Sequence, residues 1–316
     1  MTATTAETHP RSWREAWRDP SLKLQRTLAM VLLLCQGGIT VTGSLVRVTG
    51  SGLGCDTWPL CHEGSLVPVA GAAPWIYQAI EFGNRLLAFV VAAAAGLVLF
   101  AVIRAGRRKD IKTLAWISLI GVVVQAVIGG ISVRLDLRWW SVAVHFLPSM
   151  VLVFVAAMLY MRIAETDSAV PTRRYPGSAQ TWTLIAAAAL CLVLVTGTMV
   201  TGSGPHSGDA GVGMEGRLQM DTRVLAYVHS VCMYLYLIAT IITTVLLRNS
   251  GAPDDAKRTA YVLIAMILVQ WAIGVIQFRM GVPRWTIPAH IAMSSVVVAF
   301  SGFLFAHGKR RLPTLV

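Results

Sequence analysis

The sequence has few charged residues. Asp, Glu, Lys and Arg make up only 13% of its 316 residues, whereas they make up about 25% of an ordinary soluble domain. Because a soluble protein needs charged side chains on its surface, this shortage excludes a soluble globular enzyme and a disordered chain. Hydrophobic residues account for 55% of the chain, and the mean hydropathy is +0.64. The composition therefore predicts an all-α polytopic membrane protein with little mass outside the lipid bilayer.

Cysteine is also scarce, and the five cysteines are of two kinds. Three lie inside apolar stretches, where they are most simply small packing residues; these are Cys35, Cys191 and Cys232. The other two, Cys55 and Cys61, share a polar loop. We expect no cleavable signal peptide, because residues 1–26 are polar and basic and precede a full-length apolar stretch. We expect no nucleic-acid partner, since the excess of basic residues follows the pattern of membrane loops.

Eight apolar stretches are long enough to cross a hydrocarbon core of about 30 Å, which takes roughly 20 residues of helix. Backbone polar groups inside lipid must be hydrogen-bonded within the segment, so each stretch is predicted to be a helix. The stretches are 27–46, 76–103, 113–133, 140–161, 180–200, 223–247, 259–278 and 286–306.

Basic residues cluster in every second gap between these stretches. The clusters lie within 11–26, 104–112, 162–174, 248–258 and 309–311, and they hold most of the 27 Lys and Arg residues. Cytoplasmic loops of membrane proteins are enriched in Lys and Arg. We therefore predict a multi-pass protein of the cell membrane with both termini in the cytoplasm, which requires an even number of spans.

An internal repeat relates the two halves of the chain. A shift of 145 residues superposes segment 125–153 on segment 270–298. The aligned pairs include Gln125 with Gln270, Gly129 with Gly274, Arg134 with Arg279, and His145 with His290. Such a repeat predicts two pseudo-symmetric four-helix bundles related by an axis along the membrane normal.

The predicted boundaries follow from the repeat and from the charge pattern. The N-terminal bundle is expected to span 27–162 and the C-terminal bundle 180–307. A cytoplasmic linker at 163–179 is expected to join them, with cytoplasmic tails at 1–26 and 308–316.

Three histidines lie inside the apolar stretches at nearly the same predicted depth: His145, His229 and His290. The shift of 145 residues that aligns His145 with His290 also aligns Asn84 with His229. The C-terminal half therefore offers a His/His pair, and the N-terminal half an Asn/His pair. Ionisable groups are costly in a membrane and commonly serve a function there. The alternative is that each histidine is a hydrogen-bonded packing residue, which matched depth and the repeat make less favourable.

Two facing histidines within a helical bundle suit the axial positions of one haem iron. Zinc would require additional Cys or carboxylate ligands, and none is suitably spaced. The propionates of a haem need cations, and Arg134 and Arg279 lie at the outer ends of their helices, together with Arg138 and Arg284 in the following loops. These arginines have an equally simple explanation as anchors of helix ends in the lipid headgroups.

Glu81 is the only carboxylate inside an apolar stretch, three residues before Asn84 and four before Arg85. The spacing to Arg85 allows a buried ion pair on one helix face. The functional interpretation is an acid, base or proton relay beside a haem, and we favour it.

The loop that holds Cys55 and Cys61 lies on the predicted outer side, where oxidising conditions allow a disulfide. We favour a structural crosslink, and a redox-active pair is the alternative.

Several motifs together resemble the haem A synthase family. They are Thr49-Gly-Ser-Gly-Leu-Gly-Cys-Asp-Thr-Trp-Pro-Leu-Cys61, Ile80-Glu-Phe-Gly-Asn-Arg85 and Val200-Thr-Gly-Ser-Gly-Pro-His-Ser-Gly-Asp209. With the repeated Gln-to-His segments, the resemblance covers essentially the whole chain. It implies an eight-helix membrane enzyme of two similar halves, which oxidises the C8 methyl group of haem O to a formyl group. The product, haem A, serves cytochrome oxidase assembly.

The resemblance also implies roles for individual residues. His229 and His290 match the ligands of a resident haem b, whereas Glu81 and His145 match the site of the substrate haem. Cys55 and Cys61 match a pair that forms a disulfide in related members. The chain departs from the family at Asn84, where many members have a second histidine. An amide is a poor iron ligand, and an open iron position in this half is a hypothesis.

Our leading hypothesis is haem O oxidation in the N-terminal half, with electrons passed on by the haem b of the C-terminal half. Glu81 would handle protons or orient the substrate. The alternatives are a dihaem b-type electron-transfer cytochrome and a haem carrier. Expected partners are a haem O synthase and cytochrome oxidase assembly factors, and a homo-oligomer is compatible with the sequence.

Overall fold

The computed structural model describes residues 17–205 and 216–311, which form an all-helical membrane protein. Within these residues, eight helices are long and apolar enough to cross a membrane. They are α2 (Leu22–Thr49), α3 (Trp75–Arg104), α4 (Lys109–Arg134), α5 (Trp139–Ile163), α6 (Gly177–Ser203), α7 (Thr222–Asn249), α8 (Asp254–Arg279) and α9 (Thr286–His307). Each apolar stretch of the sequence lies inside one of these helices, so the predicted fold class is confirmed.

Local signals in the sequence mark the start of two helices and the end of one. The Ser21 hydroxyl accepts a hydrogen bond from the Leu24 N–H (3.2 Å), and the Asp221 carboxylate accepts one from the Arg223 N–H (2.7 Å). Each side chain thereby satisfies a backbone donor that the first helical turn leaves unpaired. Helix α2 ends where Gly50 adopts a φ of 73°, a left-handed conformation that glycine adopts without steric cost.

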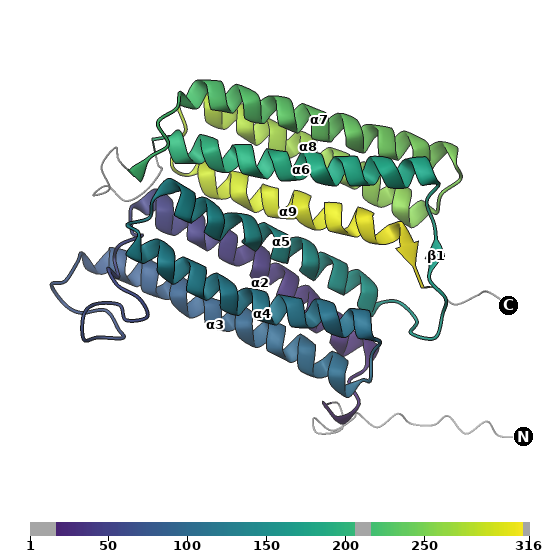
Figure 1. The fold of residues 1–316 in the computed structure, drawn as a ribbon, viewed down its shortest axis with the longest axis horizontal. Helices are drawn as coiled ribbons and strands as arrows, with labels where there is room; N and C mark the ends of the chain where they lie inside the picture. The colour runs from purple at the N-terminus through teal and green to yellow at the C-terminus, as the bar shows by residue number, and fades with distance from the viewer. Residues whose placement is uncertain (1–16, 206–215, 312–316) are drawn as a thin grey trace, which may run out of the picture.

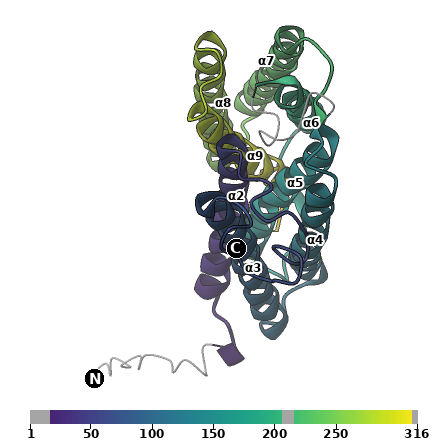
Figure 2. The same cartoon turned by 90° about the vertical axis from the view of Figure 1, so that its left-hand side faces the viewer.

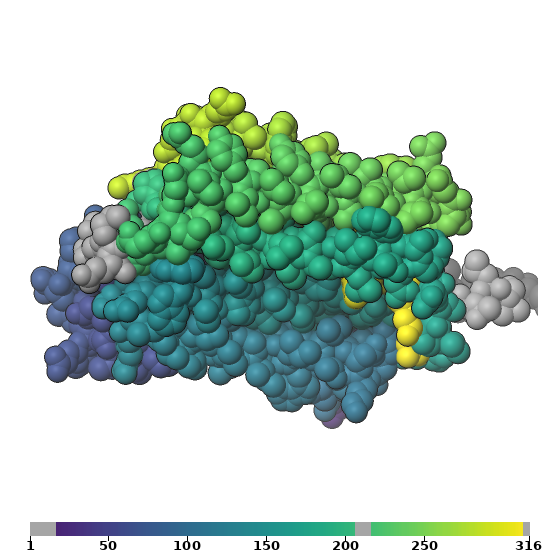
Figure 3. All heavy atoms as spheres, turned by 45° about the horizontal axis from the view of Figure 1, so that its top comes forward, coloured from purple at the N-terminus to yellow at the C-terminus, as the bar shows by residue number. Residues whose placement is uncertain are grey.

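The helices pack as two adjacent groups of four (Figures 1 and 2). Helices α2 to α5 form a closed ring, in which each helix contacts two neighbours. Helices α6 to α9 form a more open arrangement, because α6 and α9 touch only over a short stretch. Helix α9 joins the groups by packing against α5 and α2, and Figure 3 shows the two groups lying side by side. The division of the chain into two functional halves stays a prediction.

Small side chains at the junction allow the helices to approach closely. A Cβ placed on Gly302 of α9 would lie 3.0 Å from the Cβ of Ala157 on α5. The Thr40 and Ser295 hydroxyls are 2.9 Å apart across the contact of α2 with α9. Without a strong hydrophobic drive between helices in lipid, such close packing and polar contacts hold a bundle together. Large apolar side chains such as Leu34 and Phe89 are exposed and face outward.

We name the two ends of the bundle by their connections. The loop end carries the segments 50–74, 135–138 and 280–285, and the tail end carries 105–108, 164–176 and 308–311. At the tail end, the short strands β1 (Thr172–Arg173) and β2 (Lys309–Arg310) pair antiparallel, so the segment after α5 meets the segment after α9.

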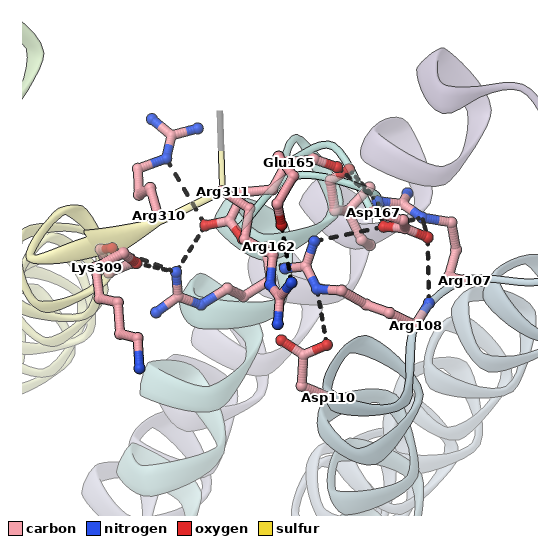
Figure 4. A network of polar contacts seen from close by, with 12 residues as sticks. Arg107, Arg108, Asp110, Arg162, Glu165, Asp167, Lys309, Arg310 and Arg311 are labelled. Atoms are coloured by element: carbon pink, nitrogen blue, oxygen red, sulfur yellow. Dashed lines mark hydrogen bonds and ion pairs between the residues drawn. The ribbon is translucent and has the colours of Figure 1, made fainter. Parts of the chain in front are cut away.

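Charged side chains reinforce the tail end (Figure 4). Glu165 is 4% exposed and pairs with Arg108 (2.5 Å) and Arg162 (2.6 Å). Arg107 pairs with Asp167 (3.0 Å). Partial burial alone would raise the pKa of the Asp167 carboxyl, but hydrogen bonds and charge from Arg107 and Arg108 outweigh it and lower this pKa below its usual range. Arg310, after α9, also forms an ion pair with Glu165 (3.8 Å), so the tail end ties α4, α5 and the chain after α9 together.

Candidate functional site

Two imidazoles face each other in the C-terminal group of helices. The ring centroids of His229 on α7 and His290 on α9 lie 6.4 Å apart, with 55° between the ring planes. Two metal–nitrogen bonds of about 2 Å plus the two ring radii place the centroids of a bis-imidazole site roughly 6 Å apart. The observed spacing therefore fits axial ligation of one iron.

Glycines on neighbouring helices make room for these rings. A Cβ placed on Gly197 of α6 would lie 3.2 Å from Cε1 of His229, and one on Gly274 of α8 would lie 3.3 Å from Cε1 of His290. The same relation holds in the N-terminal group, where a Cβ on Gly129 of α4 would lie 3.0 Å from Cε1 of His145. In all three membrane histidines, Cε1 thus lies close to a glycine of a neighbouring helix.

The orientation of His229 is set by α6. Its Nδ1 lies 3.0 Å from the carbonyl oxygen of Val193 and 3.2 Å from the hydroxyl oxygen of Thr196. Because a carbonyl only accepts hydrogen bonds, Nδ1 carries the proton and Nε2 keeps its lone pair for a metal. A backbone carbonyl in this position is a common partner of metal-ligating histidines. The sequence reasoning missed Val193 and Thr196.

A glutamine and a serine form hydrogen bonds at the backbone carbonyl of each of the other two histidines, His290 and His145. In the C-terminal group, Gln270 of α8 donates to the Ser294 hydroxyl (2.8 Å), which donates to the His290 carbonyl oxygen (2.8 Å).

The same contacts occur at the corresponding N-terminal positions. Gln125 of α4 donates to the His145 carbonyl oxygen (2.7 Å) and to the Ser149 hydroxyl, which in turn donates to that carbonyl (3.1 Å). The aligned Gln residues of the repeat are the sequence signal for this contact, although the sequence alone did not assign it.

Both groups leave the same polar atoms buried without a partner. They are Nδ1 of His145, Nδ1 of His290, and the side-chain oxygens of Gln125 and Gln270. Buried polar atoms nearly always have hydrogen-bond partners, and exceptions call for an explanation such as a bound group or water. Among the described residues, no group of three or more His, Cys, Asp and Glu side chains is arranged to hold a metal ion. The donor set therefore fits a haem, which needs only axial imidazoles, better than a protein-caged metal.

The N-terminal group has an amide in place of the second imidazole. Asn84 lies on α3, where its side-chain oxygen accepts a hydrogen bond of 2.7 Å from the Thr42 hydroxyl of α2. His145 is the only histidine within helices α2 to α5 as the structure describes them. The two groups of helices therefore differ in the number of imidazoles that they offer.

Glu81 forms the ion pair that its spacing predicts. Its carboxylate, 5% exposed, accepts a hydrogen bond of 2.6 Å from Arg85 on the same helix and one of 2.7 Å from the Cys55 N–H. Arg85 also donates to the carbonyl oxygens of Cys55, Thr57 and Leu60, each at 3.0 Å. The two charges thus hold the loop that begins after α2. A role of Glu81 in proton transfer stays a prediction.

The loop is closed by the Cys55–Cys61 disulfide, and both cysteines are fully buried. Trp58 at its tip packs on α4, since a Cβ on Gly130 would lie 2.2 Å from its indole ring. Arg134 of α4 donates to the Trp58 carbonyl oxygen through Nε (3.0 Å) and Nη2 (2.6 Å). The loop therefore covers the loop end of the N-terminal group, close to the glycine that faces His145.

The two arginines predicted to bind propionates have different surroundings. Arg134 is engaged with the loop, whereas the exposed guanidinium of Arg279 has no hydrogen bond or ion pair among the described residues. Their role as propionate partners stays a prediction. Residues 206–209 of the second loop motif lie outside the described residues. Its first part contacts the other group, since the Thr201 carbonyl oxygen accepts a hydrogen bond of 3.0 Å from Arg47.

Comparison with known proteins identifies the family of the chain. The chain matches a family model described as cytochrome oxidase assembly protein over residues 26–301. It is 36% identical over 147 residues to a heme A synthase of Exiguobacterium sp., covering 45% of this chain and 44% of the relative. It is 29% identical over 151 residues to one of Macrococcus caseolyticus, covering 48% of each. A third, from Bacillus licheniformis, is 32% identical over 147 residues, covering 45% and 44%.

The chain thus spans about half the length of the curated relatives it matches, whereas the family model extends from α2 into α9. Because that model covers most of the chain, including the three membrane imidazoles and the disulfide loop, this protein belongs to the COX15-CtaA family of cytochrome oxidase assembly proteins.

Proposed function

We propose that the protein is a haem A synthase, an oxidoreductase that converts the C8 methyl group of haem O to the formyl group of haem A. The observation that carries the proposal is the pair of facing imidazoles, His229 and His290, with a ring separation of 6.4 Å. The family membership and the names of the similar proteins support the same conclusion.

In this proposal, the C-terminal group of helices binds the resident haem b. His229 and His290 hold its iron, and the Val193 carbonyl keeps Nε2 of His229 free for ligation. Gly197 and Gly274 leave room for the rings, because an added Cβ would lie only 3.2 and 3.3 Å from Cε1 of His229 and His290 and would displace them. When bound, haem b supplies one-electron transfer. The contribution of the chain is to fix both imidazoles in orientation and to exclude water.

The N-terminal group of helices binds the substrate haem O through His145. The disulfide loop, held by Glu81, Arg85 and Arg134, covers this site at the loop end. Glu81 acts with His145 in the catalytic site: both of its carboxylate oxygens are engaged, so it orients the loop above the substrate. Transfer of a proton by Glu81 requires release of one of these two contacts. Arg134 and Arg279 are proposed to bind propionates.

The proposed orientation follows the basic clusters. The tail end and both termini lie in the cytoplasm of a cell whose membrane the protein crosses, and the loop end lies outside, where the disulfide is stable. The partners are a haem O synthase that supplies the hydrophobic substrate, and assembly factors of cytochrome oxidase that receive the product.

The test is to supply haem O, a reductant and oxygen to the purified protein and to extract the haem for chromatography and mass spectrometry. We expect a product with a formyl group, and we expect its loss in His145→Ala. If protein that retains haem b returns only unchanged haem O, the proposal is overturned in favour of an electron-transfer cytochrome or a haem carrier.

A further inference from the structure

We propose that Asn84 makes the N-terminal site a one-histidine haem site, whose second axial position is open to a small diatomic ligand that the Asn84 amide N–H stabilises. This inference rests on the proposed function, because it requires a haem on His145. It adds a binding site for a further ligand and assigns the residue that shapes it.

The first observation is the contact that holds His229 on α6. In the tripeptide Val195-Thr196-Gly197, the threonine hydroxyl oxygen lies 3.2 Å from the imidazole Nδ1. The glycine lies next to the ring, so that a Cβ added to it would be 3.2 Å from Cε1. A threonine followed by a glycine therefore forms a shallow, polar surface that accommodates an imidazole. We call this threonine–glycine surface the seat.

The same seat exists on α2, but a different side chain occupies it. The tripeptide Val41-Thr42-Gly43 has the same sequence, and the Thr42 hydroxyl donates to the Asn84 side-chain oxygen at 2.7 Å. A Cβ placed on Gly43 meets nothing within 4 Å, so there is open space beside this glycine. The hydroxyl contact is kept, whereas the ring is absent.

The position of Asn84 relative to His145 follows from the repeat. Asn84 aligns with His229 and His145 with His290 by the same shift of 145 residues. In the ring of α2 to α5, helices α3 and α5 have α2 and α4 as shared neighbours, as α7 and α9 share α6 and α8. Because His229 and His290 face each other at 6.4 Å, we infer that Asn84 lies opposite His145 across the N-terminal site.

The chemistry of the amide selects the ligand class. With its oxygen engaged by Thr42, Asn84 presents the Nδ2 amide, which makes no hydrogen bond to any described residue. A neutral amide is a poor iron ligand, so it leaves the axial position vacant. Hydrogen-bond donors and steric access on the open face of a haem decide whether small ligands bind. A neutral N–H donor beside unfilled space fits a diatomic molecule and not a bulky or charged one.

Carbon monoxide is the probe for this site, added to the dithionite-reduced protein loaded with both haems. We expect half of the haem to bind it, because the site of His229 and His290 has no open position. In Asn84→His, the new imidazole fits the seat at Gly43, so carbon monoxide affinity should fall at least tenfold and a high-spin ferric signal should become low-spin. In Asn84→Leu, binding should persist, with a higher C–O stretching frequency because the N–H donor is lost.

The reciprocal variant is the matched control. His229→Asn recreates the N-terminal arrangement against Thr196 and Gly197, and it should gain carbon monoxide binding at the second haem. The inference is overturned if Asn84→His retains wild-type carbon monoxide binding and its high-spin signal while His145→Ala loses one haem equivalent. If His145→Ala keeps both haem equivalents, the assignment of the substrate site is itself wrong, and the proposed function fails with it.

Discussion

The two groups of four helices share a local contact, in which a threonine hydroxyl holds a side chain of the next helix, but they hold different side chains with it. In the C-terminal group, Thr196 and Gly197 seat an imidazole, and the opposite helix supplies another. In the N-terminal group, the equivalent seat at Thr42 holds the amide of Asn84, and one imidazole remains. A fixed pair of imidazoles suits a haem that stays, whereas a single one suits a haem that enters and leaves. In the proposed function, one side chain per site therefore separates a resident cofactor from an exchangeable substrate.

The two groups also differ at the loop end, where only the N-terminal group has charged residues that hold the disulfide loop. Glu81 and Arg85 of α3 hold the disulfide loop, but the aligned residues of α7 are Ala226 and Ser230, which carry no charge. Likewise, Gly130 of α4 receives the Trp58 indole, whereas the aligned Val275 of α8 is 39% exposed. The cover over the N-terminal site is thus built from residues that the other group lacks.

The largest expected effect is on the C-terminal pair. His290→Ala should lose the low-spin bis-histidine spectrum of the resident haem b, because one imidazole cannot provide both axial bonds. The measurement is haem content per protein together with the reduced-minus-oxidised spectrum. His307→Ala, at the far end of the same helix, is the matched control and should keep full haem content. A normal bis-histidine spectrum in His290→Ala would contradict the assignment of this ligand.

The next effect separates the two ways in which Glu81 can act. Glu81→Ala leaves the buried Arg85 charge without its partner, and we expect a loss of about 3 kcal/mol in the free energy of unfolding. The double variant Glu81→Ala/Arg85→Ala should recover part of this loss, because it removes both charges. Unfolding in detergent with increasing denaturant measures both. Full stability of Glu81→Ala would show that the ion pair has no structural role, leaving only the proton-transfer role.

A third prediction concerns the cover itself. Gly130→Ala places a methyl group 2.2 Å from the Trp58 ring, so the loop must move. We expect the free energy of unfolding to fall by about 2 kcal/mol. We also expect dithiothreitol to reduce the buried Cys55–Cys61 disulfide faster, and thiol labelling measures the rate of reduction. Gly83→Ala, where a Cβ meets nothing within 4 Å, is the control and should leave the reduction rate unchanged. Equal rates in wild type and Gly130→Ala would mean that Trp58 does not hold the loop down.

The smallest effect is expected at the tail end, which both groups share. Because the pKa of Asp167 is lowered in the folded protein, its contribution to stability is complete above the ordinary carboxyl pKa of about 4. The contribution is lost as the pH falls through the lowered pKa. Asp167→Asn should lower the free energy of unfolding by less than about 1 kcal/mol at neutral pH. In this variant, the thermal unfolding midpoint should fall less steeply as the pH is lowered. An identical decline in the variant would assign that pH dependence to other groups.

Much of the architecture is predictable because lipid imposes it. A backbone in hydrocarbon must satisfy its own hydrogen bonds, so apolar stretches of sufficient length become helices. Ser21 and Gly50 mark the start and the end of α2, and Asp221 marks the start of α7. Contacts within one helix are equally accessible, as the Glu81–Arg85 pair shows, because four residues bring two side chains onto one face.

Contacts between distant segments are a different matter. No sequence pattern near Cys55 predicts that its N–H donates to Glu81. Arg134, which we expected to bind a propionate, donates to the Trp58 carbonyl. These contacts depend on how closely two helices approach and on how a loop folds back over them. The amino-acid order alone therefore established the helices, the repeat and which residues are candidates for chemistry. Packing in three dimensions decided which of them meet, because the distances between helices arise from the whole set of side chains between them and not from any local pattern.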